Sequence, residues 1–154
     1  MTFGILLAFA SVLQAQFYNG HQMKFGKNRV QFDEFEWYYF RFQNFDTYFV
    51  AGSKDVALKA SSIANKNLSE IETFLEHQLK KRIVFVIYKN QSDFRQSNIG
   101  LNTGDEQYNI GGVVKVVDNI AFIFVEGDLK SLERQVKSAI ANVFLNELLY
   151  GDNI

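Results

Sequence analysis

The longest amphipathic pattern in the chain lies close to its end, over residues 128–150. Apolar positions recur there at steps of three and four, a spacing that places them on one face of a helix. The positions on this face are Leu132, Val136, Ile140, Val143, Phe144 and Leu148. Asp128 is a favoured N-cap residue type, and Gly151 is suited to end the helix. The pattern predicts a long final helix whose apolar face packs on the rest of the domain.

Strand signals occur in three parts of the chain. Aromatic and β-branched runs bounded by polar turn residues predict an antiparallel hairpin, and the most apolar run predicts a central strand. A third region predicts two strands around Asp118-Asn119, a pair suited to a type I′ turn. These regions are 37–52 (WYYFRF and DTYFVAG), 82–90 (RIVFVIYKN) and 113–126.

The remaining segments predict helices and a loop. Residues 53–80 have helical periodicity with an expected break at 65–67, and His77 falls near the helix C-terminus, where a cation is favoured. Residues 92–97 predict a short capped helix, and 98–112 a long loop. The predicted order is β-β-α-β-(short α)-β-β-α. This order indicates an α+β fold with a mixed sheet of about five strands packed against two long helices.

Composition narrows the classes of function. A chain of 154 residues with 47% hydrophobic residues is sufficient for one globular domain. The formal net charge of −1 gives no general electrostatic reason to bind nucleic acid. The chain has no Cys and only two His, at positions 21 and 77, so it contains neither a thiolate site nor a three-histidine zinc site.

The first residues resemble an export signal. Residues 1–15 combine an apolar run with a small residue, Ala15, before the polar Gln16, which predicts a secretory signal peptide cleaved between these two residues. A buried N-terminal helix is the alternative interpretation. Residues 16–36 show no sustained period and predict an irregular lead-in, so that the domain proper covers 37–154. The protein is expected to be exported, to the periplasm or the outer cell envelope.

The predicted final helix also contains the only candidate for catalysis. Asn146-Glu147-Leu148-Leu149-Tyr150 has the layout of the zinc-protease motif His-Glu-x-x-His, with both histidines replaced. In that motif, residues at i and i+4 present two imidazoles to one metal ion. Asn146 and Tyr150 are poor zinc ligands, so neither a metal nor another cofactor is predicted. A coincidence, in which Glu147 is simply a polar residue on a packed helix, is the competing interpretation.

Three stretches resemble a known family: residues 25–52, residues 87–102, and the closing helix with its LYGDNI ending. They are similar to the N-terminal, peptidase-MA-like (gluzincin-like) domain of exported TolB-like β-propeller proteins from Bacteroidetes-type bacteria. The resemblance implies that Asn146 and Tyr150 stand at the histidine positions and Glu147 at the catalytic glutamate position. It also implies the N-terminal half of such a domain, because neither the helix with the third ligand nor a propeller follows. We therefore expect an N-terminal fragment of a longer protein.

The leading hypothesis is a non-catalytic, peptidase-like exported domain that serves as a scaffold or protein-interaction module in the cell envelope. Its expected partner is another protein, or a further part of the same chain, that covers the last helix. No nucleic acid partner and no membrane-spanning segment after signal removal are expected.

Two other classes of function stay open. The first is an active hydrolase, which needs ligands from outside this chain or a metal-free mechanism that uses Glu147 with Asp105, Glu106 or Asp128. The second is a peptide- or glycan-binding module. It would use the loop 98–112 and a row of alternate strand residues on one sheet face, namely Trp37, Tyr39 and Arg41.

Overall fold

The computed structural model describes most of the predicted domain. The described residues are 34–97, 99, 115–125 and 127–151. The predicted signal peptide, nearly all of the lead-in, and the predicted loop 98–112 except Ile99 lie outside the described residues.

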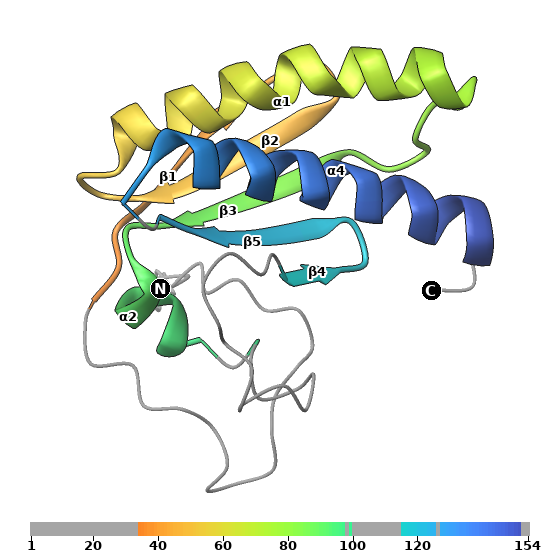
Figure 1. The fold of residues 1–154 in the computed structure, drawn as a ribbon. Coiled ribbons are helices and arrows are strands. Elements are labelled where there is room, and N and C mark those ends of the chain that lie inside the picture. The colour runs from red at the N-terminus through yellow and green to blue at the C-terminus, as the bar shows by residue number, and fades with distance from the viewer. Residues whose placement is uncertain (1–33, 98, 100–114, 126, 152–154) are drawn as a thin grey trace, which may run out of the picture.

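The described part of the chain is an α+β fold, as the sequence predicts, and its elements follow the predicted order (Figure 1). The first half contains β1 (Trp37–Arg41), β2 (Phe45–Val50), α1 (Lys54–Leu75) and β3 (Ile83–Tyr88). The second half contains α2 (Gln91–Arg95), β4 (Lys115–Val117), β5 (Ile120–Phe124) and α4 (Leu129–Tyr150). α4 begins after the N-cap Asp128, whose side chain accepts a hydrogen bond from Ser131 N–H, and ends at Gly151. Both ends agree with the prediction.

The strands form one mixed five-stranded sheet in the order β1-β2-β3-β5-β4. β1 pairs with β2 and β4 with β5 in antiparallel fashion, whereas β3 runs parallel to both β2 and β5. The predicted central strand is therefore in the middle of the sheet. Because β2 and β3 are parallel neighbours, α1 has to cross over between them.

α1 and α4 lie side by side on one face of the sheet and run in the same direction (Figure 1). The main core lies between this helix pair and the sheet. Alternate residues of β2 and β3 point into it, including Phe45 and Phe85, whose rings meet edge to face at 5.7 Å. From α4, five of the six predicted face residues are fully or almost fully buried: Leu132, Val136, Ile140, Val143 and Phe144.

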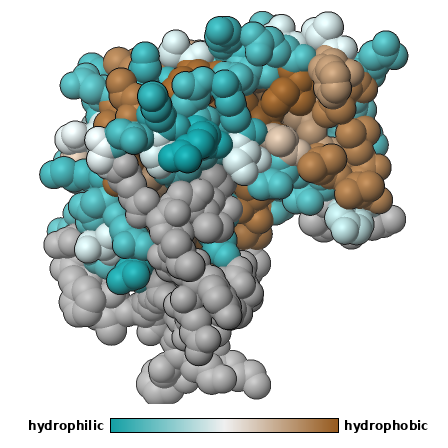
Figure 2. Space-filling view, in the orientation of Figure 1, coloured by the Kyte–Doolittle hydropathy of each residue, from teal (hydrophilic) through white to brown (hydrophobic). Residues whose placement is uncertain are grey.

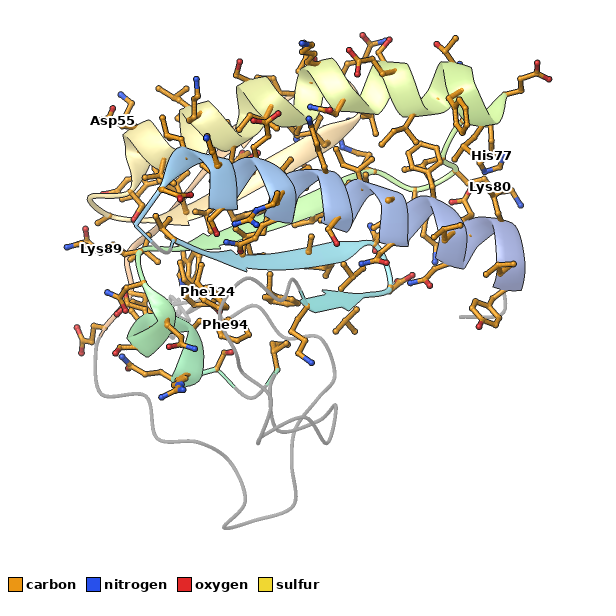
Figure 3. The ribbon with its side chains drawn as sticks, in the orientation of Figure 1. Asp55, His77, Lys80, Lys89, Phe94 and Phe124 are labelled. Atoms are coloured by element: carbon orange, nitrogen blue, oxygen red, sulfur yellow. The ribbon has the colours of Figure 1, made fainter. Side chains whose placement is uncertain are left out.

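A smaller second core lies on the opposite face of the sheet, where α2 packs. Phe94 of α2 stacks on Phe124 of β5, with 5.2 Å between ring centroids (Figure 3). Tyr88 of β3 meets Phe94 edge to face. Burial raises the pKa of Tyr88 to about 12, although a hydrogen bond with Ser97 acts in the opposite direction.

Three local predictions are wrong. α1 runs without a break through 65–67, because Asn67 points inward and its side chain donates to the carbonyl of Ile63 inside the helix. α1 also ends at Leu75 rather than at residue 80, since Glu76 adopts the left-handed conformation with φ of 50°. At the β4–β5 turn, Asp118 has a positive φ and Asn119 does not, so the turn is not of type I′.

Candidate functional site

The candidate site lies where the last turns of α4 meet the segment that follows α1 (Figure 3). The left-handed Glu76 ends α1, and the N–H of His77 then donates to the carbonyl of Glu72 at 3.2 Å. This closure of the helix end reverses the chain and brings His77 and Lys80 beside α4. The two segments are joined there by Glu147.

Glu147 accepts hydrogen bonds from two groups of this segment. Its Oε1 lies 2.7 Å from Nε2 of His77 and 3.2 Å from the backbone nitrogen of Lys80, and its Oε2 lies 3.3 Å from the same nitrogen. The Glu147 side chain is only 13% exposed and that of His77 27%. Both carboxylate oxygens are thus used in holding the end of α4 to the end of α1.

The imidazole of His77 also contacts an aromatic ring of α4. The ring of His77 meets that of Phe144 edge to face, with 6.2 Å between centroids. Phe144 precedes Glu147 by three residues on α4, so both side chains lie on the same side of the helix. The imidazole therefore lies against an aromatic ring while its Nε2 meets the carboxylate.

The three positions of the degenerate motif have different surroundings. Glu147 points toward the α1 end, Asn146 is half-buried, and Tyr150 is 61% exposed. Within the described ranges, no group of three or more His, Asp or Glu side chains is arranged to hold a metal ion. The local chemistry of the site is that of one imidazole–carboxylate pair.

The proposed pairing of Glu147 with a second carboxylate does not occur at Asp128. Asp128 caps the start of α4 and Glu147 lies in its last turn, nineteen residues later. At 1.5 Å per residue the two positions are about 28 Å apart, well beyond the roughly 5–10 Å over which two carboxyl groups share catalysis. Asp105 and Glu106 lie outside the described residues.

Leu148 is the one predicted core position of α4 that is not buried. It is 46% exposed, and it is joined by Leu145, Leu149 and Tyr150, which are between 49% and 69% exposed. We call these four residues the α4 end surface. Hydrophobic residues gather at this end of the molecule in Figure 2. In Figure 1 the last turns of α4 extend past the β4–β5 turn, so the sheet does not cover them.

The row Trp37, Tyr39 and Arg41 lies on the face of β1 opposite the two long helices. Trp37 is half-buried and meets Tyr88 edge to face at 5.4 Å. Tyr39 is 55% exposed and stacks on Tyr48 of β2, and the guanidinium of Arg41 lies 5.7 Å from the Tyr39 ring centroid. Of the two aromatic rings in the row, that of Tyr39 is the more open to solvent.

A second polar cluster, which the sequence did not indicate, fixes the β1–β2 turn. Asp46 is 5% exposed and accepts hydrogen bonds from Arg82 at 2.8 Å and from Arg41 at 3.1 Å. Arg82 also donates to backbone carbonyls of this turn, including that of Phe45 at 3.1 Å. Burial by itself raises the pKa of Asp46, but the hydrogen bonds and positive charges of Arg82 and Arg41 outweigh it, and its pKa lies below the ordinary value.

The sequence offered one signal for the role of Glu147. Glu147 follows Val143 by four residues and Phe144 by three, so it continues the buried stripe of α4 with a charged residue. A charge on such a stripe needs a partner. The partner itself was hidden, because His77 is 70 positions away in sequence. His77 was expected near the helix C-terminus, where a cation is favoured. It lies just beyond the end of α1 and contacts Glu147 there.

No family model, curated protein or solved structure matches this chain. None of the helices in the described ranges combines the length and the apolar character needed to cross a bilayer.

Proposed function

We propose that this chain is a non-catalytic, peptidase-like exported domain that serves as a scaffold or protein-interaction module in the bacterial cell envelope. The end of α4 gives the main support. The last turns of α4 use Glu147 to bind the segment after α1, and they expose a set of large apolar side chains beside it.

The bonding of Glu147 argues against a catalytic role. A glutamate that activates a metal-bound water needs an oxygen directed at that water. Here both oxygens of Glu147 already accept from the Lys80 N–H, and one also meets His77. The residues at the ligand positions of the motif are Asn146 and Tyr150, which do not favour zinc. Glu147 is therefore assigned a structural role.

The α4 end surface supports an interaction role. Large apolar side chains grouped on one surface mark contact sites for other molecules more often than isolated exposed residues do. Leu149 and Tyr150 expose more than half of their surface, and Leu145 and Leu148 nearly half. An apolar protein surface is the ligand that this composition suits.

Metal content tests the non-catalytic part of the proposal. The full chain is dialysed against zinc together with a weak chelator, and its metal is then measured by elemental analysis. We expect much less than one zinc per chain, because Glu147 and His77 supply at most two ligands among the described residues. One zinc per chain, lost in Glu147→Gln, would overturn the proposal.

A matched pair of surface variants tests the interaction part. Leu149→Lys places a charge on the α4 end surface, and Leu129→Lys places one at the other end of the same helix, where Leu129 is 62% exposed. The free energy of unfolding of each variant should lie within about 0.5 kcal/mol of that of the parent protein. The parent chain and both variants are immobilised and exposed to a bacterial envelope extract. We expect the parent chain and Leu129→Lys to capture the same proteins, and Leu149→Lys to capture them no longer. Equal capture by the two variants would contradict the assignment.

A hydrolase is the second candidate, and the His77–Glu147 pair favours it. An imidazole 2.7 Å from a carboxylate has the spacing of a general base and the group that orients it. If this pair is catalytic, hydrolysis of generic ester or peptide substrates should fall about 100-fold or more in His77→Ala. If our proposal is right, the parent chain and His77→Ala should both hydrolyse these substrates at the background rate.

A further inference from the structure

The outer edge of β1 has features of a pairing surface. β1 pairs with β2 on one side, and on its other side no strand is found among the described residues. Sheet edges in monomeric proteins are usually protected by Lys, Pro or a bulge. The sequence of β1, Trp-Tyr-Tyr-Phe-Arg, contains neither Lys nor Pro, and its register with β2 is continuous. Its only charge is that of Arg41.

The hydrogen-bond phase of the β1–β2 ladder shows which backbone groups face outward. Ala51 N–H donates to the carbonyl of Glu36, and Phe42 N–H donates to that of Phe45, both at 2.9 Å. In an antiparallel ladder the bonded pairs alternate with non-bonded ones. Residues 36, 38, 40 and 42 therefore bond with β2, and the N–H and C=O of Tyr39 point away from it.

Aromatic side chains stand on both sides of this edge. Tyr38 is 51% exposed and stacks on Phe49, a residue of the main core. Tyr39 is 55% exposed and stacks on Tyr48 on the opposite face. A strand added at this edge would therefore meet aromatic surface on both faces as well as outward backbone groups at Tyr39.

We propose that a second copy of this chain adds its own β1 to this edge, antiparallel and about a two-fold axis that passes through Tyr39. In that register the N–H and C=O groups of the two Tyr39 residues exchange hydrogen bonds. Tyr38 of one copy faces Phe40 of the other, and Arg41 faces Trp37. The two five-stranded sheets then form one continuous sheet. This surface is separate from the α4 end surface.

The charge of Arg41 is compatible with a second copy of β1 at this edge and distinguishes two of its registers. A second copy presents the same strand, and an axis at Tyr39 places each Arg41 opposite an aromatic ring, an arrangement that attracts a cation. An axis at Arg41 would place two guanidinium groups opposite each other, which is destabilising. Of these two registers, antiparallel pairing of identical strands therefore favours the axis at Tyr39.

The test compares the mass of the full chain with that of two charge variants. Light scattering is measured at about 100 μM, well above a dissociation constant in the micromolar range. The parent chain should then have about twice the monomer mass of 17.7 kDa. Tyr39→Lys and Tyr39→Glu should each be monomeric, because each places two like charges face to face across the axis. An equimolar mixture of the two variants should recover the dimer. Circular dichroism checks that both variants keep the fold.

Each contrary result overturns the inference. A monomeric parent chain removes it directly. A dimer that persists in Tyr39→Lys, or that is lost instead in Leu149→Lys, moves the contact to another surface and leaves the proposed function standing. Failure of the mixed variants to dimerise, when the parent chain does, excludes the pairing of the two Tyr39 positions.

A cysteine variant tests the register independently. The chain has no Cys, so Tyr39→Cys introduces a single thiol. In a hydrogen-bonded antiparallel pair the two Cα atoms are about 5.5 Å apart, a distance that a disulfide can span. Mild oxidation should convert Tyr39→Cys to a covalent dimer much faster than the control Leu129→Cys, which is exposed at the start of α4. Equal rates would exclude the register.

Discussion

The two parts of α4 have the same kind of sequence but different surroundings. Up to Phe144, the apolar stripe of the helix is packed against the sheet and is almost fully buried. Beyond Phe144, Leu148 continues the stripe but is 46% exposed, and the end of the helix is held by the bonds of Glu147 to the segment after α1. The first part is fixed by apolar packing, and the last turns are fixed by a polar contact.

This difference explains why one helix can both build the core and present a surface. Apolar packing stabilises only the turns that have a sheet beneath them, and α4 is longer than the strands it covers (Figure 1). A hydrogen-bonded carboxylate can position the protruding turns without covering their leucines. The leucines at the end of α4 therefore stay exposed although the helix end is held in place.

Large-to-small changes in the two parts of α4 should have unequal effects on stability. Ile140 is fully buried, so Ile140→Ala should lower the free energy of unfolding by about 2–5 kcal/mol. Leu148→Ala removes an apolar side chain that is nearly half exposed and should cost about 1 kcal/mol or less. Urea unfolding followed by circular dichroism measures both values. Similar losses would mean that the end of α4 is packed as tightly as the rest.

Removing the polar contact of Glu147 should destabilise the protein. Glu147→Ala leaves the Lys80 N–H and the His77 ring without their acceptor, so it should lower the free energy of unfolding by about 1–3 kcal/mol. The matched control is Glu133→Ala, which removes a carboxylate of the same helix that faces solvent and pairs with Lys137. Its effect should be much smaller.

A double-mutant cycle with His77→Ala isolates the pair. The losses in Glu147→Ala and His77→Ala should be less than additive in the double variant, because both remove the same contact. Strict additivity would show that the 2.7 Å contact contributes nothing to stability.

Acid titration gives the smallest expected effect and probes the polar cluster that fixes the β1–β2 turn, which lies away from α4. The pKa of Asp46 is lower in the folded state than its ordinary value of about 3.9, so the folded state binds its proton less tightly than the unfolded state. The resulting stability is fully present above pH of about 4 and is lost as the pH falls through the lower, folded pKa. In Asp46→Asn this part of the pH dependence should disappear. An unchanged acid slope would show that Arg82 and Arg41 do not hold this carboxylate in solution.

Much of the fold could be predicted from the sequence. The periodicity of 128–150, its N-cap Asp128 and its terminal Gly151 predicted α4 with nearly the observed bounds. The apolar run around Ile83–Tyr88 predicted the central strand. The sequence did not predict the end of α1. The helix ends at Glu76, which is in the left-handed conformation, and glutamate is not a residue type that usually marks a helix end.

The candidate site could be predicted only in part. Glu147 was recognised from the layout of a protease motif and lies on the buried stripe of α4, but nothing local indicated His77 or the Lys80 N–H as its partners. Likewise, Arg82 reaches Asp46 across 36 positions of sequence, and neither residue belongs to a motif. Contacts of this kind depend on which distant segments of the chain come together in the fold.

Which segments become helices and strands, and which face of each is apolar, could be read from the chain alone, because these properties follow from spacings of two to four residues. Three features became visible only in the folded protein: where the sheet stops beneath α4, which groups Glu147 bonds, and which strand lies at the edge of the described sheet. Those outcomes depend on the relative lengths and register of elements that are far apart in the chain. That is why the same apolar stripe is core at Ile140 and surface at Leu148.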